Sequence, residues 1–531
     1  MTELTNAEST NLRGSLHHAT DCHSNLLDAF LAKKDHSQNS NTHSLKMRNG
    51  GGIPQHEDPH YLYLSNPFTE VPPSQISDRV EEHRTSNTTP SRQEWTLAID
   101  LTTNGSHQAG DERVHTGAEH QMQEIMRLAA ETRGKPVTLV VQCIVNEPSE
   151  RSTGNTPASS TPESSGRQDD RSGNTIPGER EGTRMLQRYI IRNGQVELLE
   201  TRPPQGFNED LKQLLSLATH NAPSEKLGLI IQSHGAGPRG LDGDTGSLSL
   251  PQLTDTVRQS LAGTGHGKLD LLDFDACSMG NASVMEQLGD VSQHVVASSE
   301  VERSFGQNVD GQNLSAVIHN LIERPKMDGK ELGNEFVRIA DAGTNGDSSA
   351  RDPANDGHSG TDTLAHYDLS ALGEFHTALN SFGESLAASA QDPSTWAAIL
   401  QALNHAPRVS APTAEVAGRF IPQYRDLKLF AENIVAAIDH DTNHTIDRSG
   451  ALRKAAAGFL AAQNKLVTTY HGEHINGYNT MGGLSAFLPE PTTTTNIDRG
   501  QIDRVFAQQE LPSNTGWNAF LELLKATIEK P

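Results

Sequence analysis

The sequence of 531 residues has only three cysteines and no continuous apolar run that could span a membrane. Three cysteines cannot build a disulfide framework, so they leave the redox compartment open. A membrane helix needs about 20 consecutive apolar residues. The first residues also do not follow the basic-then-apolar pattern of a secretory signal. We therefore expect a protein without a membrane span that is cytoplasmic or exported by a non-classical route.

Apolar and basic side chains are scarce as well. Hydrophobic residues make up 34% of the chain and aromatic residues 5%, against roughly 45–50% apolar residues in ordinary globular domains. The 43 basic and 67 acidic residues give a formal net charge of −24. This balance argues against a nucleic-acid partner, because nucleic-acid binding needs a basic surface.

The low apolar content is concentrated in definite stretches. Residues 1–93 are polar and without periodicity, which predicts a disordered N-terminal tail. Residues 151–184 contain only two clear apolar residues and predict a disordered insertion. The remaining chain divides into an α/β core at 94–340 and a mainly helical C-terminal part at 341–531, which we expect to pack on the core.

Within the core, strands and helices alternate. Amphipathic spacing in the intervening segments predicts helices. Unbroken apolar runs predict four buried strands, at 95–101, 136–145, 227–232 and 269–276. Such strands are typical of a parallel sheet covered by helices on both faces. The Asn193-Gly194 pair between two alternating segments predicts a hairpin. Beyond Glu300 the pattern is mainly helical, and GGLSAFLP at 482–489 is predicted as an isolated late strand.

Two of the buried strands are followed by reactive side chains. LIIQSHGAG places His234 just after one strand, and LDLLDFDACSMG places Cys277 just after the next. The carboxyl ends of parallel strands meet at one edge of a sheet. A thiolate attacks carbonyl carbon, and a neighbouring imidazole can activate the thiol or protonate the leaving group. The backbone N–H groups of Gly235 and Cys277 are then the candidate donors of an oxyanion hole.

Each signal also has an ordinary structural interpretation. A cysteine after apolar residues is commonly a small core residue, and a His-Gly pair is commonly a turn. Their occurrence at consecutive strand ends favours thiol catalysis over two unrelated structural roles.

The segments WTLAIDL, HGAG and DFDACSMG resemble the clostripain-like cysteine peptidases, whose clan also contains gingipains, legumain and caspases. The resemblance continues through HVVASSE, TDTLAHYDLSAL, RDLKLFAENI and GGLSAFLP, and covers roughly residues 94–491 without the insertion. It implies a caspase-like, mostly parallel sheet flanked by helices. It also implies a cysteine endopeptidase in which His234 and Cys277 form the catalytic dyad.

The resemblance also implies a substrate class. Asp275 matches the acidic residue of the family's primary specificity pocket, which implies protein or peptide substrates cleaved after Arg or Lys. Alternate residues of a strand share a face, so Asp275 can lie near Cys277 and meet a cationic side chain. Glu300 matches a recurrent glutamate that borders the pocket. The alternative for Asp275 is a structural carboxylate that caps a neighbouring helix or loop.

The sequence departs from the family pattern at two places near these residues. VERSFGQNVDG at 301–311 replaces a loop that is usually rich in Pro, Gly and Trp. Gln232 and Ser233 replace the usual Trp-containing pair before the histidine. Substrate choice is open for this reason, although neither departure removes a reacting group.

Self-processing and calcium are further implications of the resemblance. Family members often cut themselves between the histidine and the cysteine, where Arg239, Arg258 and Lys268 are the basic residues here. The arginines of the 151–184 insertion are a more accessible alternative.

The chemistry itself needs no cofactor, but clostripain-type enzymes can depend on calcium. Asp439, Asp441 and Asn443 alternate as the first ligands of a calcium loop do. The glycine and the bidentate glutamate of such a loop are replaced by His444 and Gly450, which favours a degenerate loop.

Two other function classes remain open. The chain could be a catalytically silent effector or interaction protein built on the same fold, or a calcium-regulated binding module. The retained histidine, cysteine and aspartate favour the peptidase.

Overall fold

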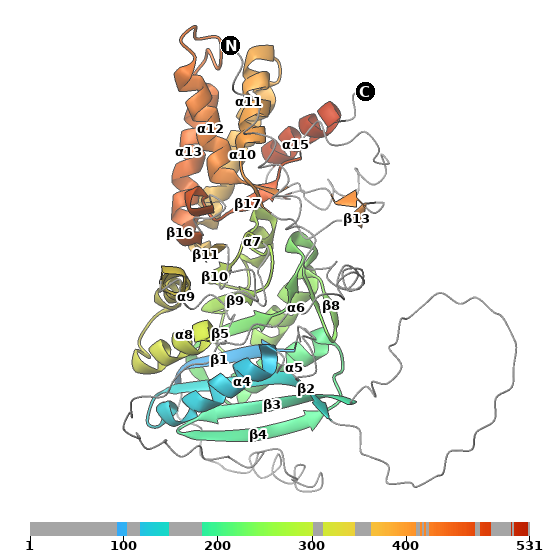
Figure 1. Cartoon of the computed structure of the whole chain (residues 1–531), viewed down its shortest axis with the longest axis vertical. Helices are drawn as coiled ribbons and strands as arrows, with labels where there is room; N and C mark the ends of the chain where they lie inside the picture. The colour runs from blue at the N-terminus through green and yellow to red at the C-terminus, as the bar shows by residue number, and fades with distance from the viewer. Residues whose placement is uncertain are drawn as a thin grey trace, which may run out of the picture. The chain divides into compact units, whose positions relative to one another are not determined.

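The computed structural model describes residues 93–102, 117–147, 183–300, 312–345, 363–409, 415–416, 419–420, 424–472, 478–489, 511 and 515–528 (Figure 1). The predicted N-terminal tail up to residue 92, residues 151–182 of the predicted insertion and the divergent 301–311 loop lie outside this description. Every described residue falls within one unit, Pro90–Pro531.

A central sheet organises the described part of the chain, which contributes nine strands to it in the order β16-β11-β10-β9-β5-β1-β2-β3-β4. The five inner strands run parallel. They are β10 (His294–Ala297), β9 (Leu271–Asp275), β5 (Ser224–Gln232), β1 (Gln93–Leu101) and β2 (Val137–Glu147).

Two antiparallel strands extend each side of the sheet. They are β3 (Thr183–Arg192) and β4 (Gln195–Arg202) on one side, and β11 (Thr363–Asp368) and β16 (Val467–Gly472) on the other. The predicted mostly parallel sheet is confirmed.

Helices cover both faces, because the inner strands are apolar on both. Ala98, Leu229 and Phe274 belong to one core cluster, while Leu97 and Ile230 belong to the other. The first cluster includes residues of α5 (Phe207–His220), α6 (Leu250–Leu261) and α7 (Ala282–Leu288). The second includes residues of α4 (Gly117–Arg127), η2 (Leu128–Thr132), α8 (Gln312–Glu323) and α9 (Gly329–Asn345).

Local turn chemistry also follows the sequence. Asn193 and Gly194 both have positive φ, 51° and 79°, as the two central residues of the tight turn between β3 and β4 require. The Gly194 N–H donates to the Thr132 hydroxyl at 2.9 Å, so the turn is anchored to η2. The hairpin prediction is confirmed.

The C-terminal part is mainly helical, as predicted. Its helices are α10 (Leu372–Ser389, after η6, Leu369–Ala371), α11 (Pro393–His405), α12 (Leu427–His440), α13 (Ala451–Leu466) and α15 (Thr515–Ile528). Aromatic rings join them: Phe382 stacks on Phe459 with centroids 5.2 Å apart, and Phe430 stacks on Phe520 at 6.1 Å. None of the described helices is long and apolar enough to cross a membrane.

The C-terminal part also contains strands that were not predicted. β11 and β16 join the central sheet, and β13 (Glu415–Val416) pairs with β14 (Arg419–Phe420). The late strand β17 (Ser485–Phe487) is not isolated, which corrects the prediction. It pairs with β15 (Tyr424–Asp426), which also pairs with β12 (Arg408–Val409). A short turn, η7 (Tyr478–Thr480), precedes it.

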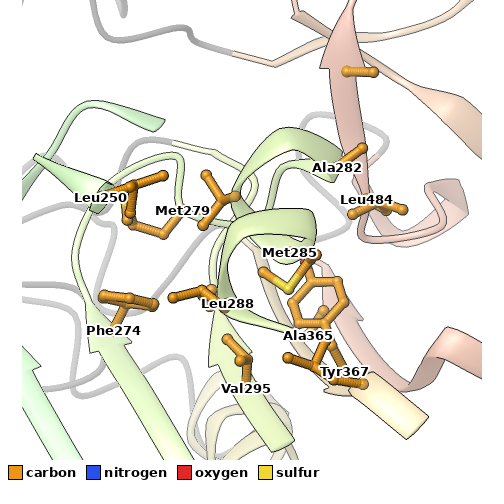
Figure 2. Close-up of a cluster of buried hydrophobic side chains, with 14 of the residues drawn as sticks. Leu250, Phe274, Met279, Ala282, Met285, Leu288, Val295, Ala365, Tyr367 and Leu484 are labelled. Carbon is orange, nitrogen blue, oxygen red and sulfur yellow. The ribbon is translucent and has the colours of Figure 1, made fainter. Parts of the chain in front are cut away.

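The first core cluster continues from the sheet into the C-terminal part. Figure 2 shows part of it, with side chains from α6, β9, α7, β10 and β11 and from the segment just before β17. The labelled residues are Leu250, Phe274, Met279, Ala282, Met285, Leu288, Val295, Ala365, Tyr367 and Leu484.

Candidate active site

His234 and Cys277 follow two neighbouring parallel strands, and the register of these strands brings them together. Gln232, the last residue of β5, is paired with Asp275, the last residue of β9. The Ser233 N–H continues the pairing by donating to the Asp275 carbonyl at 3.1 Å. His234 and Cys277 therefore each stand two residues beyond a matched pair, at the carboxyl edge of the sheet.

Gly235 shows how closely the two strand ends approach. A Cβ atom built on Gly235 would collide with the carbonyl oxygen of Cys277 and lie 2.8 Å from both its carbonyl carbon and its nitrogen. The backbone beside His234 thus packs directly on the backbone of Cys277. Only glycine leaves room for this contact.

A small three-stranded sheet orients the Gly235 amide. It consists of β6 (His234–Gly235), β7 (Leu241–Gly243) and β8 (Gly246–Leu248), with η3 (Gly237–Arg239) in the first connection. The Ala236 N–H donates to the Gly240 carbonyl at 2.8 Å. Hydrogen-bonded and non-hydrogen-bonded pairs alternate along an antiparallel ladder, so the Gly235 N–H points away from β7.

The turn after Cys277 connects β9 to the end of β10. Ser278 adopts a left-handed conformation, with φ of 61°, and its N–H donates to the Glu300 carbonyl at 2.9 Å. The Gly280 N–H donates to the Ser298 carbonyl at 2.6 Å. Because the Ser278 amide is already bound, it is not a candidate for holding an oxyanion.

Burial differs among the predicted site residues. The Cys277 side chain is outside any disulfide and has a relative exposure of 6%, while His234 is partly exposed. Asp275 and Glu300 are 2% and 1% exposed. The structure therefore places all four at the ends of β5, β9 and β10, with the two carboxylates deepest.

Glu300 is held in a polar environment that includes groups the sequence analysis missed. Its N–H donates to the hydroxyls of Ser298 and Thr363, at 3.1 and 3.2 Å. Burial raises the pKa of the Tyr470 hydroxyl, and the negative charges of Asp426 and Glu300 add to this effect. Thr363 begins β11 and Tyr470 lies in β16, the two strands that were not predicted.

The proposed calcium ligands make other contacts in the structure. The Asp439 carboxylate forms an ion pair with Arg453, with Oδ1 2.7 Å from Nε. The Asp441 carboxylate accepts backbone N–H groups of Asn443, Thr445 and others, which closes the turn after α12. Within the described ranges, no three His, Cys, Asp or Glu side chains are grouped to hold a metal ion. Calcium ligation by Asp439, Asp441 and Asn443 stays a prediction.

The chain is similar to two solved cysteine protease structures at low sequence identity. No curated protein sequence matches the chain. A secreted C11 cysteine protease from Bacteroides thetaiotaomicron, solved with an irreversible peptide inhibitor, is 13% identical with a TM-score of 0.46, covering 81% of this chain and 99% of that one. An inactive zymogen C11 protease from Parabacteroides distasonis is 13% identical with a TM-score of 0.44, covering 76% and 94%.

The sequence model of the clostripain family matches residues 196–522, which is more than half of the chain. The match includes both His234 and Cys277, and it extends through the C-terminal helices to α15. The chain belongs to the clostripain family of cysteine peptidases.

Proposed function

We propose that the chain is an endopeptidase that cleaves peptide bonds after Arg or Lys with Cys277 as the nucleophile and His234 as its proton acceptor. The observation that carries the proposal is the contact between the backbones of Gly235 and Cys277 at adjacent parallel strand ends. This contact supports a dyad, because it holds the residue next to Gly235 beside the thiol.

The proposed reaction uses groups of this chain alone. The Cys277 thiol loses its proton to His234, and the sulfur attacks the scissile carbonyl carbon. The carbonyl electrons move onto oxygen, where the Gly235 and Cys277 N–H groups donate to the oxyanion. His234 then delivers the proton to the leaving amine as the C–N bond breaks, leaving an acyl-enzyme. Water, deprotonated by His234, hydrolyses the thioester and frees the thiol.

Charge supports the preference for basic substrates. Asp275 shares the end of β9 with the nucleophile, and Glu300 is tied by its carbonyl to Ser278. Two buried carboxylates at this edge are suited to a guanidinium or ammonium group. The formal net charge of −24 also favours the approach of cationic peptides.

Among the basic residues between the dyad members, Arg239 is the best placed for self-cleavage. It is exposed and lies in the short η3 connection. Arg258 is within helix α6 and pairs with Asp255 at 2.6 Å, and the Lys268 ammonium donates to the Gly289 carbonyl at 2.5 Å. A peptidase binds its substrate as an extended segment, which favours the loop over the helix.

Fluorogenic peptides ending in Arg or Lys test the proposal. Under reducing conditions the wild type should cleave them, and Cys277→Ala should lose at least about 1,000-fold in kcat/KM because the nucleophile is gone. Cys143→Ala, at a buried thiol in β2, is the matched control and should keep its activity.

Gel analysis of the same proteins examines self-cleavage. The wild type should fragment, whereas Cys277→Ala stays whole. Equal hydrolysis by wild type and Cys277→Ala, or no hydrolysis of any basic peptide, would contradict the proposed activity and favour a silent binding protein. Identical gel bands for both proteins would contradict self-processing only.

A further inference from the structure

The turn at residues 277–281 is held on one side by the end of β10, and the space around it is tightly limited. The Gly280 N–H donates to the Ser298 carbonyl at 2.6 Å. A Cβ atom on Gly280 would lie 2.5 Å from the Tyr367 hydroxyl and 2.7 Å from the Ser299 nitrogen. The turn therefore cannot shift toward β10 or β11.

The other side of the turn is held by Ser485 in β17. Both the backbone N–H and the hydroxyl of Ser485 donate to the Gly280 carbonyl, at 3.0 and 3.1 Å. The Asn281 side-chain amide in turn donates to the Ser485 hydroxyl at 3.3 Å. Three hydrogen bonds thus join Ser485 to two successive residues of the turn. Ser485 and Gly280 are 205 positions apart in the sequence.

Ser485 is itself fixed by rigid surroundings. It pairs with Asp426 of β15, whose carboxylate accepts the Gly482 N–H at 2.9 Å. The Tyr367 hydroxyl donates to the Gly483 carbonyl, and the Leu427 N–H donates to the Leu484 carbonyl at 3.0 Å. A side chain supported in this way can hold a neighbouring group in one position.

Asn281 transmits the contact to α7. Its side-chain oxygen accepts the Ser283 N–H at 2.9 Å and caps the helix, while its amide nitrogen reaches Ser485. Leu484 packs beside Ala282 at the start of the same helix (Figure 2). The segment that begins β17 therefore contacts the turn and the helix that follows it.

We propose that Ser485 is a positioning residue for the nucleophile. By binding the Gly280 carbonyl it fixes the 277–281 turn, and so it sets the position of the Cys277 sulfur relative to the His234 imidazole. The inference rests on the proposed role of Cys277 and goes beyond it, because it makes a serine of the C-terminal part necessary for the full rate.

Steady-state kinetics of Ser485→Ala test this inference. Loss of the hydroxyl should lower kcat about tenfold and leave KM within about twofold, because the reacting atoms are misplaced while substrate contacts remain. Ser292→Ala is the matched control, since Ser292 is also buried and donates to a backbone carbonyl, that of His294, at the opposite end of β10. It should keep the wild-type kcat. Ser485→Thr, which retains a hydroxyl, should restore most of the rate.

Alkylation of Cys277 by iodoacetamide gives a readout that needs no peptide substrate. Followed by peptide mass spectrometry across pH, the wild-type thiol should react with an apparent pKa below the roughly 8.5 of a free cysteine. In Ser485→Ala the profile should move toward that of a free thiol, because the sulfur is less well placed beside His234. Should the alanine variant not fold, Ser485→Cys repeats both measurements with a weak donor of similar shape.

The outcomes separate the two proposals. If Ser485→Ala keeps the wild-type kcat and alkylation profile, the positioning role is wrong while the peptidase mechanism stands. If kcat falls equally in Ser292→Ala, the effect is one of general stability and the inference is again overturned. If the wild type itself neither cleaves basic peptides nor shows a reactive Cys277, both proposals fail together.

Discussion

Gly235 is the residue whose environment bears most directly on the proposed chemistry. Its missing side chain allows the backbone to pack on Cys277, and its N–H points away from β7. We predict that Gly235→Ala lowers kcat/KM at least about 100-fold, because the two strand ends must separate and a shift of about 1 Å is enough for such a loss. The assay is hydrolysis of the Arg peptide, with circular dichroism to confirm folding.

Gly458→Ala is the control for this glycine. Gly458 lies within α13, and a Cβ there meets no atom within 4 Å. Alanine should raise the free energy of unfolding by about 0.5–1 kcal/mol through its better helix propensity and leave kcat/KM unchanged. A fully active Gly235→Ala enzyme would show that the observed backbone contact is not needed for catalysis.

At the scale of single elements, α9 lies against a pair of histidines on the sheet. The imidazoles of His366 in β11 and His294 in β10 are joined at 3.1 Å, and the other ring nitrogen of His366 meets Asn334 of α9 at 2.8 Å. Gly333 lets the helix approach, since a Cβ there would lie 2.5 Å from the His366 ring. A pair of neutral rings satisfies this arrangement, one as donor and one as acceptor.

This packing predicts acid sensitivity. Burial, together with the neighbouring His294, lowers the pKa of His366 to about 3, from a usual value near 6.5. Above pH 6.5 this ring is neutral in both the folded and the unfolded chain, so it does not lower the free energy of unfolding. As pH falls below 6.5, the unfolded chain takes up the proton first, and the free energy of unfolding decreases. The loss should be about 1.4 kcal/mol per pH unit for this group.

Urea unfolding of wild type and His366→Gln from pH 7.5 to 5.0 measures this effect. The variant should have a lower free energy of unfolding at pH 7.5, because a buried hydrogen-bonded ring is replaced. The difference in free energy of unfolding between the two proteins should become smaller as pH falls, because only the wild type has the His366 ring to protonate. If the difference in free energy of unfolding between wild type and His366→Gln stays constant with pH, the acid sensitivity does not come from His366.

The inner strands, and the meeting of His234 and Cys277 at their ends, could be predicted from sequence for a physical reason. β5 and β9 are unbroken apolar runs, and His234 and Cys277 come directly after them. The sequence therefore shows both where each strand ends and which side chain follows it. The missed strand β11 alternates its side chains between two buried clusters, with Ala365 and Tyr367 on one face and Leu364 on the other. Because both faces of β11 are buried and a helix follows soon after, the strand lacks the simple apolar and polar alternation of a half-exposed strand.

The contacts made by β17 could not be predicted at all. The pattern of GGLSAFLP predicts a strand, but nothing in it indicates that Ser485 binds the Gly280 carbonyl or that Gly482 binds Asp426. These contacts join segments 205 and 56 positions apart in the chain, and no local pattern records such a pairing.

For the whole molecule, the sheet and the C-terminal helices share one core. A single cluster contains Phe274 of β9, Met285 of α7, Phe375 of α10 and Phe459 of α13. The C-terminal part also supplies β11 and β16 to the central sheet. Opening either part would expose apolar surface of the other, so we expect the described part of the chain to unfold as one cooperative unit.

The three tryptophans of the chain allow this cooperativity to be tested. Trp95 is buried in β1, where its ring N–H donates to the Met327 carbonyl at 2.9 Å, while Trp396 and Trp517 pack against Phe520 in the helical part. A variant with Trp396→Phe and Trp517→Phe reports on the sheet alone, and Trp95→Phe reports on the helices alone. In each variant, the urea midpoint from fluorescence should equal the midpoint from far-UV circular dichroism. A sheet that keeps its Trp95 signal after the helical signal has gone would mean that the C-terminal part unfolds independently. Ser485 would then be able to separate from the 277–281 turn while the sheet remained folded.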